Sequence, residues 1–301
     1  MALATNKIDI NRTTTGLTLS PEQSAEIWAG VAEESAIMRL ARPITLPGSG
    51  ISIPVITGEP VADFVTESAE KPVSKATFAT KTMTPYKIAV IELMSMEFER
   101  DFDALAAELV RRLPYSIAHK FDQVVANGTA PGTGFDVLSN ATAVSLVPSG
   151  SATVYDQLVT AVTTVGAGGY NLDGWVMAPQ AKANLLSAVD GFGRPLLIES
   201  INDDRDIARL IGASVAYAKS VYKAGSGSTP NTVGVAGDWS RARYGIVNGI
   251  NVRRSEEATI NTGTEQVNLW QRNMVAYMVE AEVGFVVESA SAFVRLTTPA
   301  S

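Results

Sequence analysis

The chain has 301 residues, of which 46% are hydrophobic, so it can bury a substantial core and form one to three domains. Its 31 acidic and 24 basic residues give a net charge of −7, which argues against a protein that grips nucleic acid through its phosphates. The absence of cysteine excludes disulfides, thiolate chemistry and zinc–sulfur sites, and a single histidine, His119, excludes a histidine-rich metal site.

The sequence contains no segment that indicates membrane insertion or secretion. Residues 1–11 lack the apolar core of a signal peptide, and no stretch approaches the roughly 18 apolar residues of a membrane span. We therefore expect a soluble protein that is made and used in a cytoplasm and has no membrane partner.

An arm followed by a helix is predicted at the N-terminal end. Residues 5–19 are polar, rich in threonine and without hydrophobic periodicity, which is typical of an extended arm. The segment Ser20-Pro21-Glu22-Gln23 is a capping box with proline at the first helical position, and it predicts a helix to about Leu40. Trp28 belongs to the short apolar face of this helix, and Arg42-Pro43 ends it.

A long hairpin is predicted next. Ile51–Thr57 and Phe78–Leu93 are rich in branched residues and partly alternating, which indicates two strands. The polar segment Gly58–Thr77 between them has few large apolar residues and forms a wide tip. Such a hairpin is marginal alone in water, so it either folds back on its own domain or gains its packing partner on another subunit.

The segment Ser95–Gly128 predicts a long helix around which the chain is organised. Large apolar residues recur at steps of three and four along it, and Asn127-Gly128 is a C-terminal stop. Pro114 costs about 3 kcal/mol in a helix interior unless it is compensated. Because the apolar stripe continues in phase through this proline, we predict one kinked helix about 50 Å long, with two abutting helices as the alternative.

The middle of the chain alternates between helix and strand, which is typical of a small mixed α/β domain. Ser149–Thr153 is a small-residue linker and a candidate domain boundary. The predicted elements are the helices Val154–Val165 and Pro179–Val189, the buried strand Asp173–Met177, the turn Asp190–Leu197, the apolar segment Ile207–Ala218 leading to a strand, the loop Lys223–Asn231 and the strand Thr232–Ala236.

From Gly237 onward the chain is rich in strand signals. The polar segment Glu256–Glu265 is predicted to be a loop. The strands expected after it are Val267–Val279, Ala281–Val287 and Ala292–Leu296. No internal repeat is present.

The sequence contains no motif that indicates catalysis. GxSxG, GxxxxGK[ST] and HExxH are absent, and the glycine-rich segments lack the context of a dinucleotide loop. Residues 202–206 are acidic but lack calcium-loop spacing, so we interpret them as a solvated turn. We interpret His119 as a solvated or capped side chain rather than a catalytic base. The segment Trp239–Tyr244 reads as a domain junction rather than a nucleic-acid patch. We therefore expect no enzyme activity, cofactor or metal.

Several short motifs, in order along nearly the whole chain, resemble those of the tailed-bacteriophage major capsid proteins with the Hong Kong 97-type fold. The matching segments are Asp63-Phe64-Val65-Thr66-Glu67, Ser95-Met96-Glu97, Asp122 with Asn127-Gly128-Thr129 and Pro131 to Phe135, Asp190 to Arg194, Leu210-Ile211-Gly212, Gly237-Asp238-Trp239 and Ala292 to Leu296.

The resemblance implies an α+β fold with an N-terminal arm, an extended E-loop hairpin, a peripheral domain with a long spine helix, and an axial α/β domain. The implied segments are an arm at residues 1–46, an E-loop at 47–93, a peripheral domain with the spine helix at 94–149, an axial domain at 150–240, peripheral return strands at 241–289 and a C-terminal segment at 290–301.

The resemblance also implies a function. Copies would self-assemble into pentamers and hexamers that form the icosahedral head of a tailed phage, assembled in the host bacterial cytoplasm and enclosing double-stranded DNA without sequence-specific binding. Separate scaffolding, portal and decoration proteins would be further partners. The residues implied at inter-subunit contacts are Trp28, Phe64, Val65, Glu67, Lys71, Lys75, Lys81, Asn261 and Thr264.

Two alternatives stay open at this point. An encapsulin-like compartment shell that encloses a cargo enzyme has the same fold. Some relatives join an E-loop lysine to a peripheral-domain asparagine, and no motif selects a pair among Lys71, Lys75 and Lys81 on one side and Asn248, Asn251 and Asn268 on the other.

Overall fold

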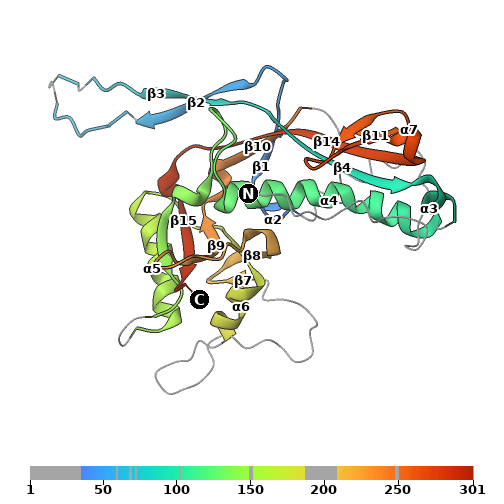
Figure 1. The fold of residues 1–301 in the computed structure, drawn as a ribbon. Coiled ribbons are helices and arrows are strands. Elements are labelled where there is room, and N and C mark those ends of the chain that lie inside the picture. The colour runs from blue at the N-terminus through green and yellow to red at the C-terminus, as the bar shows by residue number, and fades with distance from the viewer. Residues whose placement is uncertain are drawn as a thin grey trace.

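Two β-sheets flank a long helix, and a two-stranded hairpin projects from them (Figure 1). The computed structural model describes residues 35–58, 60–67, 70–71, 73–101, 103–148, 152–186, 209–247 and 251–300. Trp28, the predicted arm, the turn at 190–197 and the acidic segment 202–206 lie outside these ranges. None of the helices in the described ranges is long and apolar enough to cross a membrane.

The predicted long helix is present on both sides of Phe102, which lies outside the described residues. It comprises α3 (Met96–Asp101) and α4 (Asp103–Asn127), and α4 passes through Pro114 as one continuous helix (Figure 1). The buried face of α4 carries Leu113, Ile117, Phe121 and Val125, in steps of four, as the apolar periodicity predicts.

One face of a five-stranded sheet packs against α4. Its central strand β14 (Met274–Val287) pairs antiparallel with β4 (Tyr86–Ser95) on one side and with β10 (Ala242–Ile246) and β11 (Asn251–Ser255) on the other. Strand β1 (Arg42–Thr45) joins β10 in parallel. Between sheet and helix, the rings of Phe121 and Phe285 meet edge to face at 6.1 Å, so helix and sheet share one core.

A six-stranded sheet forms the second body, in the order β5-β15-β9-β6-β8-β7. Its core contains Trp175, Leu158 and Leu185, contributed by β6, α5 and α6. The bounds are β5 Thr142–Ser145, α5 Val154–Ala167, β6 Gly174–Met177, α6 Pro179–Leu186, β7 Arg209–Leu210, β8 Ala213–Tyr217, β9 Asn231–Gly237 and β15 Phe293–Thr298.

The sheet thus includes two strands, β5 and β15, from outside the segment 150–240 that the resemblance implies for an axial domain. The short elements between the two bodies and at their edges complete the fold. They are α2 Ala36–Leu40, η2 Leu138–Asn140, η3 Lys219–Val221, η4 Trp239–Arg241, β12 Thr259–Asn261, β13 Gln266–Asn268, α7 Leu269–Arg272 and η5 Ala290–Ala292.

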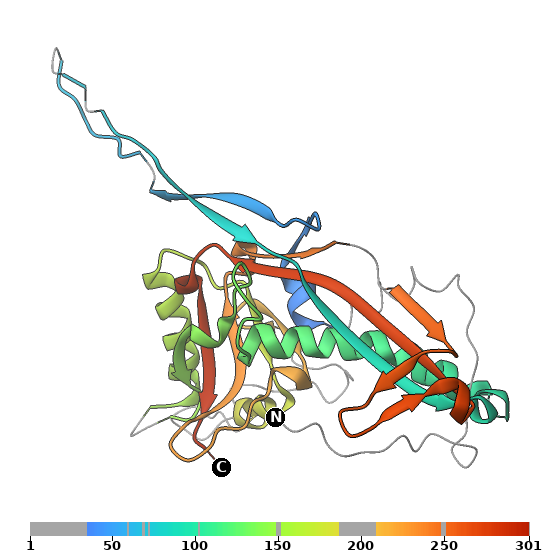
Figure 2. The same cartoon turned by 45° about the horizontal axis from the view of Figure 1, so that its top comes forward.

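The hairpin consists of β2 (Ile51–Gly58) and β3 (Thr77–Met83), which pair only with each other among the described strands. Figure 2 shows this ribbon extending well away from the two sheets. The prediction of one strand over Phe78–Leu93 is wrong, because the chain leaves the ribbon at Thr84-Pro85 and β4 continues in the five-stranded sheet. Proline has no backbone N–H to donate to a ladder, which makes this position a natural break.

Two predictions in the C-terminal part are also wrong. The predicted strand Val267–Val279 is interrupted by the helical turn α7, which Asn268 caps and which Asn273 ends in the left-handed conformation. The strand then continues without a break as β14 to Val287. The predicted loop Glu256–Glu265 contains strand β12, which pairs with β13.

Candidate assembly surfaces

The β2–β3 ribbon exposes large apolar side chains that have nothing to pack against within the described chain. Phe64 has a relative exposure of 104% and Val73 of 89%, which are values of an unpacked side chain. We call this set the hairpin surface; it consists of Ile56, Val61, Phe64, Val65, Val73 and Phe78. An exposed apolar surface of this kind marks an interaction site in a protein that folds stably.

The base of the same ribbon is fixed to the body. Ile53 and Met83 are buried in a small cluster with Leu46 and Val286 of the five-stranded sheet. Lys81 Nζ lies 2.7 Å from Asp136 Oδ2, and that carboxylate oxygen also accepts a hydrogen bond from Val287 N at 3.0 Å. The hairpin is therefore held in one direction at its base while its distal part is unsupported.

The structure divides the predicted contact residues between two ends of the molecule. Phe64, Val65, Glu67, Lys71 and Lys75 are all exposed on the distal part of the ribbon. Lys81 lies at its base in the ion pair described above, a partner that the sequence does not reveal. Trp28 lies outside the described residues.

Asn261 ends β12, and Thr264 lies in the turn between β12 and β13, next to Glu265, which is bonded to Arg272 of α7 at 3.0 Å. Figure 1 shows α7 at the end of the molecule opposite the β2–β3 ribbon. Asn261 Oδ1 accepts a hydrogen bond from Gly263 N at 2.8 Å, and Gly263 has a φ of +86° that favours glycine. Trp270 on α7 is 75% exposed at this end, a contact candidate that sequence analysis missed because the segment was read as a strand.

A buried carboxylate joins the N-terminal part of the chain to the long helix. Asp122 on α4 is 1% exposed and accepts hydrogen bonds from Ser35 Oγ at 2.6 Å and Ala36 N at 3.0 Å, at the start of α2. Burial raises the pKa of Asp122 to about 7, and the hydrogen bonds from Ser35 and Ala36 oppose that shift. The point where the described chain begins is thus fixed against α4.

A second buried carboxylate fixes the start of the long helix to the sheet. Glu99 on α3 is 8% exposed and bonds to Arg254 Nη2 at 2.8 Å and to the hydroxyl of Tyr277. Burial, with the hydrogen bond to Glu99 adding to it, raises the pKa of Tyr277 to about 12. These contacts tie α3 to β11 and β14.

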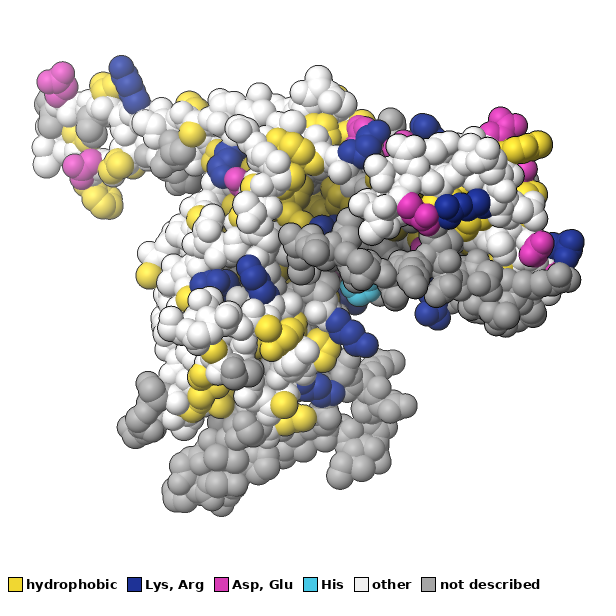
Figure 3. All heavy atoms as spheres, viewed as in Figure 1, with side chains coloured by type: hydrophobic (Ala, Val, Ile, Leu, Met, Phe, Trp, Pro, Cys, Tyr) yellow, Lys and Arg dark blue, Asp and Glu magenta, His cyan; other side chains and the backbone are white. Residues whose placement is uncertain are grey.

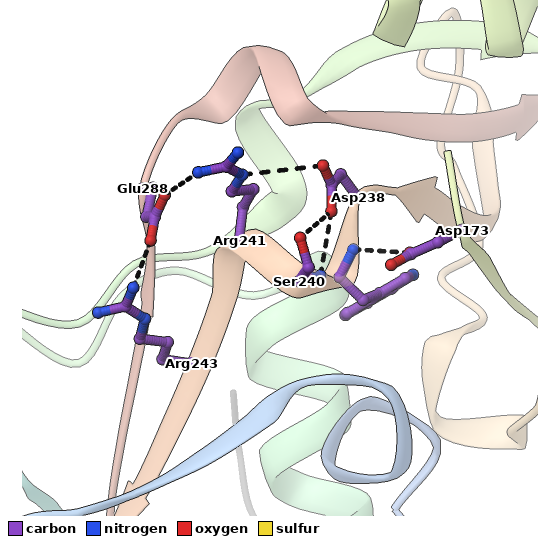
Figure 4. A network of polar contacts seen from close by, with 7 residues as sticks. Asp173, Asp238, Ser240, Arg241, Arg243 and Glu288 are labelled. Atoms are coloured by element: carbon purple, nitrogen blue, oxygen red, sulfur yellow. Dashed lines mark hydrogen bonds and ion pairs between the residues drawn. The ribbon is translucent and has the colours of Figure 1, made fainter. Parts of the chain in front are cut away.

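A polar network stabilises the junction between the two sheets (Figure 4). The chain crosses between them at η4 and again at η5, and Glu288 near the second crossing binds Arg241 (3.0 Å) and Arg243 from the first. Asp173 Oδ1 accepts a hydrogen bond from Trp239 N at 2.8 Å. Burial, together with the negative charge of Asp238, raises the pKa of Asp173. The prediction of a domain junction at Trp239–Tyr244 agrees with this geometry.

The described residues do not assemble a metal centre. They contain no group of three or more His, Cys, Asp or Glu side chains that could hold a metal ion. An open depression with a volume of about 430 Å³ lies beside Glu99 and Arg254, which are bonded to each other. His119 is exposed on α4, as predicted.

Comparison with known proteins identifies the fold and the family. The model of the phage capsid family matches residues 15–298. The probable major capsid protein gp17 of Mycobacterium phage L5 is 32% identical over 291 residues, covering 93% of this chain and 89% of the relative. The corresponding protein of Mycobacterium phage D29 is 30% identical over 294 residues, covering 94% and 91%.

Solved structures give the same result. A chain of Gordonia phage Cozz superposes with a TM-score of 0.70 at 25% identity, covering 89% of this chain and 87% of that one. A chain of Mycobacterium phage Ogopogo gives a TM-score of 0.72 at 22% identity, covering 88% and 92%. The architecture is therefore an α+β capsid fold of the Hong Kong 97 type. The chain belongs to the phage capsid family.

Proposed function

We propose that this chain is the major capsid protein of a tailed double-stranded DNA phage, and that its copies close into pentamers and hexamers of an icosahedral head. The family is one of structural proteins, so the chain is a shell component and not an enzyme. The observation that supports the mechanism of assembly is the hairpin surface, which is apolar, exposed and carried on a ribbon with a fixed base.

The energetics favour burial of the hairpin surface on a neighbouring copy. Burying one large apolar side chain contributes about 1.5–3 kcal/mol, so burying the whole hairpin surface contributes on the order of 10 kcal/mol per subunit. That contribution is comparable with the stability of a whole domain, and obligate interfaces are apolar in the same way. Folding of the subunit and assembly of the shell are then coupled.

The remaining assignments are part of the same proposal. They comprise the segment boundaries 1–46, 47–93, 94–149, 150–240, 241–289 and 290–301, the contact roles of Glu67, Lys71, Lys75, Asn261 and Thr264, and the role of Trp28 in the arm. Assembly in the host cytoplasm with separate scaffolding, portal and decoration proteins is also proposed. The named relatives are phage proteins, and no observation favours the encapsulin-like alternative.

A lysine–asparagine crosslink stays a prediction. Lys81 is held in an ion pair with Asp136, and the side-chain oxygen of Asn268 accepts a hydrogen bond from Gln271 N at 3.1 Å. Lys71 and Lys75 are exposed on the ribbon. Within the described residues, the two lysines on the distal ribbon are therefore the better candidates.

The proposal is tested by removing the hairpin surface while leaving the subunit intact. The double variant Phe64→Ser/Phe78→Ser should give folded subunits that form few or no shells in electron micrographs, because both rings are exposed in the lone chain. Deletion of Gly58–Thr77, or of Met1–Gly16, should have the same effect.

The matched control is Thr66→Ser/Thr80→Ser, which changes two exposed positions of the same ribbon and keeps its apolar groups. It should assemble like the wild type. Normal shells from both the hairpin deletion and the double phenylalanine variant would contradict this mechanism. Nuclease-protected DNA inside the particles supports a phage head, and an enclosed enzyme would contradict it.

A further inference from the structure

The exposed face of α4 carries the basic residue types Arg, His and Lys, and no described acidic side chain, along its C-terminal half. Arg112, His119 and Lys120 are exposed, and the exposed positions between and after them are the uncharged Ser116 and Gln123. Asp122, the acidic residue of this stretch, is 1% exposed on the opposite side of the helix.

Two further lysines extend this face beyond the end of α4. Element η3 packs against the last turns of the helix, where Asn127 donates a side-chain hydrogen bond to Val221 O. Lys219 lies in η3 and is exposed. Lys223 is also exposed, and its Nζ lies 3.0 Å from Asn127 O at the helix C-terminus. We call Arg112, His119, Lys120, Lys219 and Lys223 the basic strip.

The lysines of this strip differ from the cations on the other surfaces. No carboxylate of the described chain forms an ion pair with Lys120, Lys219 or Lys223. By contrast, several described cations of the hairpin base, the five-stranded sheet, α7 and the junction are paired with glutamate or aspartate; these are Lys81, Lys87, Arg241, Arg243, Arg253, Arg254 and Arg272. In a chain with a net charge of −7, these three lysines thus lie on α4 and η3 near the C-terminal end of α4, without a described carboxylate partner.

Figure 3 shows this face in part. Dark blue side chains lie below the cyan histidine near the centre of the view, while magenta and dark blue side chains are intermixed at the end that carries α7. The two regions therefore differ in their charge pattern as well as in their ion pairing.

We propose that the basic strip binds the phosphate backbone of the double-stranded DNA that the shell encloses, without reading its sequence. This inference rests on the proposed function. From Arg112 to Asn127 the helix rises about 22 Å. A DNA duplex of that length carries about 13 phosphates. Each cation of the strip therefore has a phosphate within reach, whatever its position along the duplex.

The chemistry of the strip favours DNA over a protein partner. A protein interface needs apolar or aromatic anchors at its centre, whereas Ser116 and Gln123 are the exposed residues between the cations here. Contact with a phosphate backbone needs only spaced cations. The acidic balance of the whole chain opposes tight binding, so the contact is weak and salt-sensitive, and packaged DNA can still move along the wall.

The test measures binding of a labelled 30-base-pair duplex to the purified, unassembled chain by fluorescence anisotropy at several NaCl concentrations. Replacing Lys120, Lys219 and Lys223 with Gln should reduce the slope of log Kd against log[NaCl] by about 3 and weaken binding about tenfold at low salt. Two unrelated duplex sequences should respond equally. The single variant Lys120→Gln should reduce the slope by about 1.

The matched control is Lys87→Gln/Arg253→Gln/Arg272→Gln, which removes the same charge from paired positions. It should leave the slope unchanged. If the control variant lost as much salt dependence and affinity for the duplex as the Lys120/Lys219/Lys223 variant, only the net charge of the chain would matter. That result would overturn the inference. Binding of a polyglutamate peptide but not of the duplex would also overturn it, in favour of an acidic protein segment.

Electron micrographs of the same variants separate this inference from the proposed function. The Lys120/Lys219/Lys223 variant should form shells like the wild type, because all three side chains are exposed in the subunit. A wild-type chain that never forms shells would contradict the proposed function. If the variant formed normal shells and bound DNA as the wild type does, the inference that the basic strip binds DNA would be overturned, and the proposed function would stand.

Discussion

Strands β3 and β9 each have seven residues, yet they lie in opposite environments. Every residue of β9 (NTVGVAG) is buried between β15 and β6. Of β3 (TFATKTM), Met83 is fully buried and Lys81 partly so, while the other five residues are exposed. The difference shows that the six-stranded sheet completes its packing within one chain, whereas the hairpin is stable only at its base and requires a neighbour for the rest.

Large-to-small substitutions should separate these two regions most clearly. Trp175 in β6 is 0% exposed and donates a hydrogen bond from Nε1 to Leu210 O at 3.0 Å. Trp175→Ala should lower the free energy of unfolding of the lone subunit by about 3–5 kcal/mol, because it leaves a cavity and an unpaired carbonyl.

Phe64→Ala should change the free energy of unfolding of the lone subunit by less than about 0.5 kcal/mol, because this ring makes no stabilising contacts in the subunit. Urea unfolding of unassembled protein measures both. A loss of several kcal/mol in the Phe64 variant would mean that the hairpin is already packed without a neighbour.

The link between α2 and α4 should make stability depend on pH. The pKa of Asp122 is about 7 in the folded chain against an ordinary value of 3.8, so the folded state binds more protons in that interval. The contribution of this group to stability is therefore greatest below about pH 4, falls as the pH rises to about 7 and is constant above it. The total change is on the order of a few kcal/mol.

Asp122→Asn removes this titration and keeps an oxygen that can accept from Ser35. Its free energy of unfolding relative to the wild type should therefore rise between pH 4 and 7. Glu282→Gln, on a partly exposed residue of the five-stranded sheet, serves as the control and should follow the wild type. Parallel profiles for the wild type and the Asn variant would show that Asp122 does not titrate in this range.

The ion pair at the hairpin base should have only a small effect on the stability of the subunit. The side chains of Lys81 and Asp136 are 35% and 31% exposed, so their attraction is screened by solvent. Lys81→Gln should cost about 1 kcal/mol or less in the unfolding of the subunit, and the loss should shrink in high salt. A larger cost would place the base of the hairpin within the cooperative core.

The sequence predicts elements well where the local pattern and the tertiary environment agree. Helix α5 begins at the predicted Val154 because Thr153 and Asp156 form a capping box, and the short strand β6 is wholly buried as its apolar run indicates. The long helix was predictable from its apolar stripe, which continues through Pro114.

Elements were missed where the signal depends on partners distant in the sequence. The chain changes sheet at Pro85 because β4 pairs with β14. Strand β14 lies almost 200 residues further along the chain, so no local pattern reveals this pairing. The α7 turn had a local signal in Asn268 and Asn273, but the flanking branched residues outweighed it.

The candidate surfaces were predictable in position but not in their contacts. Phe64, Val65 and the ribbon lysines are exposed as expected for a projecting tip. The bond from Ser35 to Asp122 spans 87 residues and that from Arg254 to Glu99 spans 155, so no local pattern could reveal either. The basic strip required the fold, because η3 brings Lys219 and Lys223 to the end of α4.

Strand β14 determines how a subunit resists a pulling force. It is about 46 Å long and has ladder partners on both edges, β4 on one and β10 with β11 on the other. Tension directed along this strand loads those ladder bonds side by side in shear, so they must rupture together rather than unzip in turn. A subunit pulled along β14 is therefore held by the ladders on both edges of this strand at once.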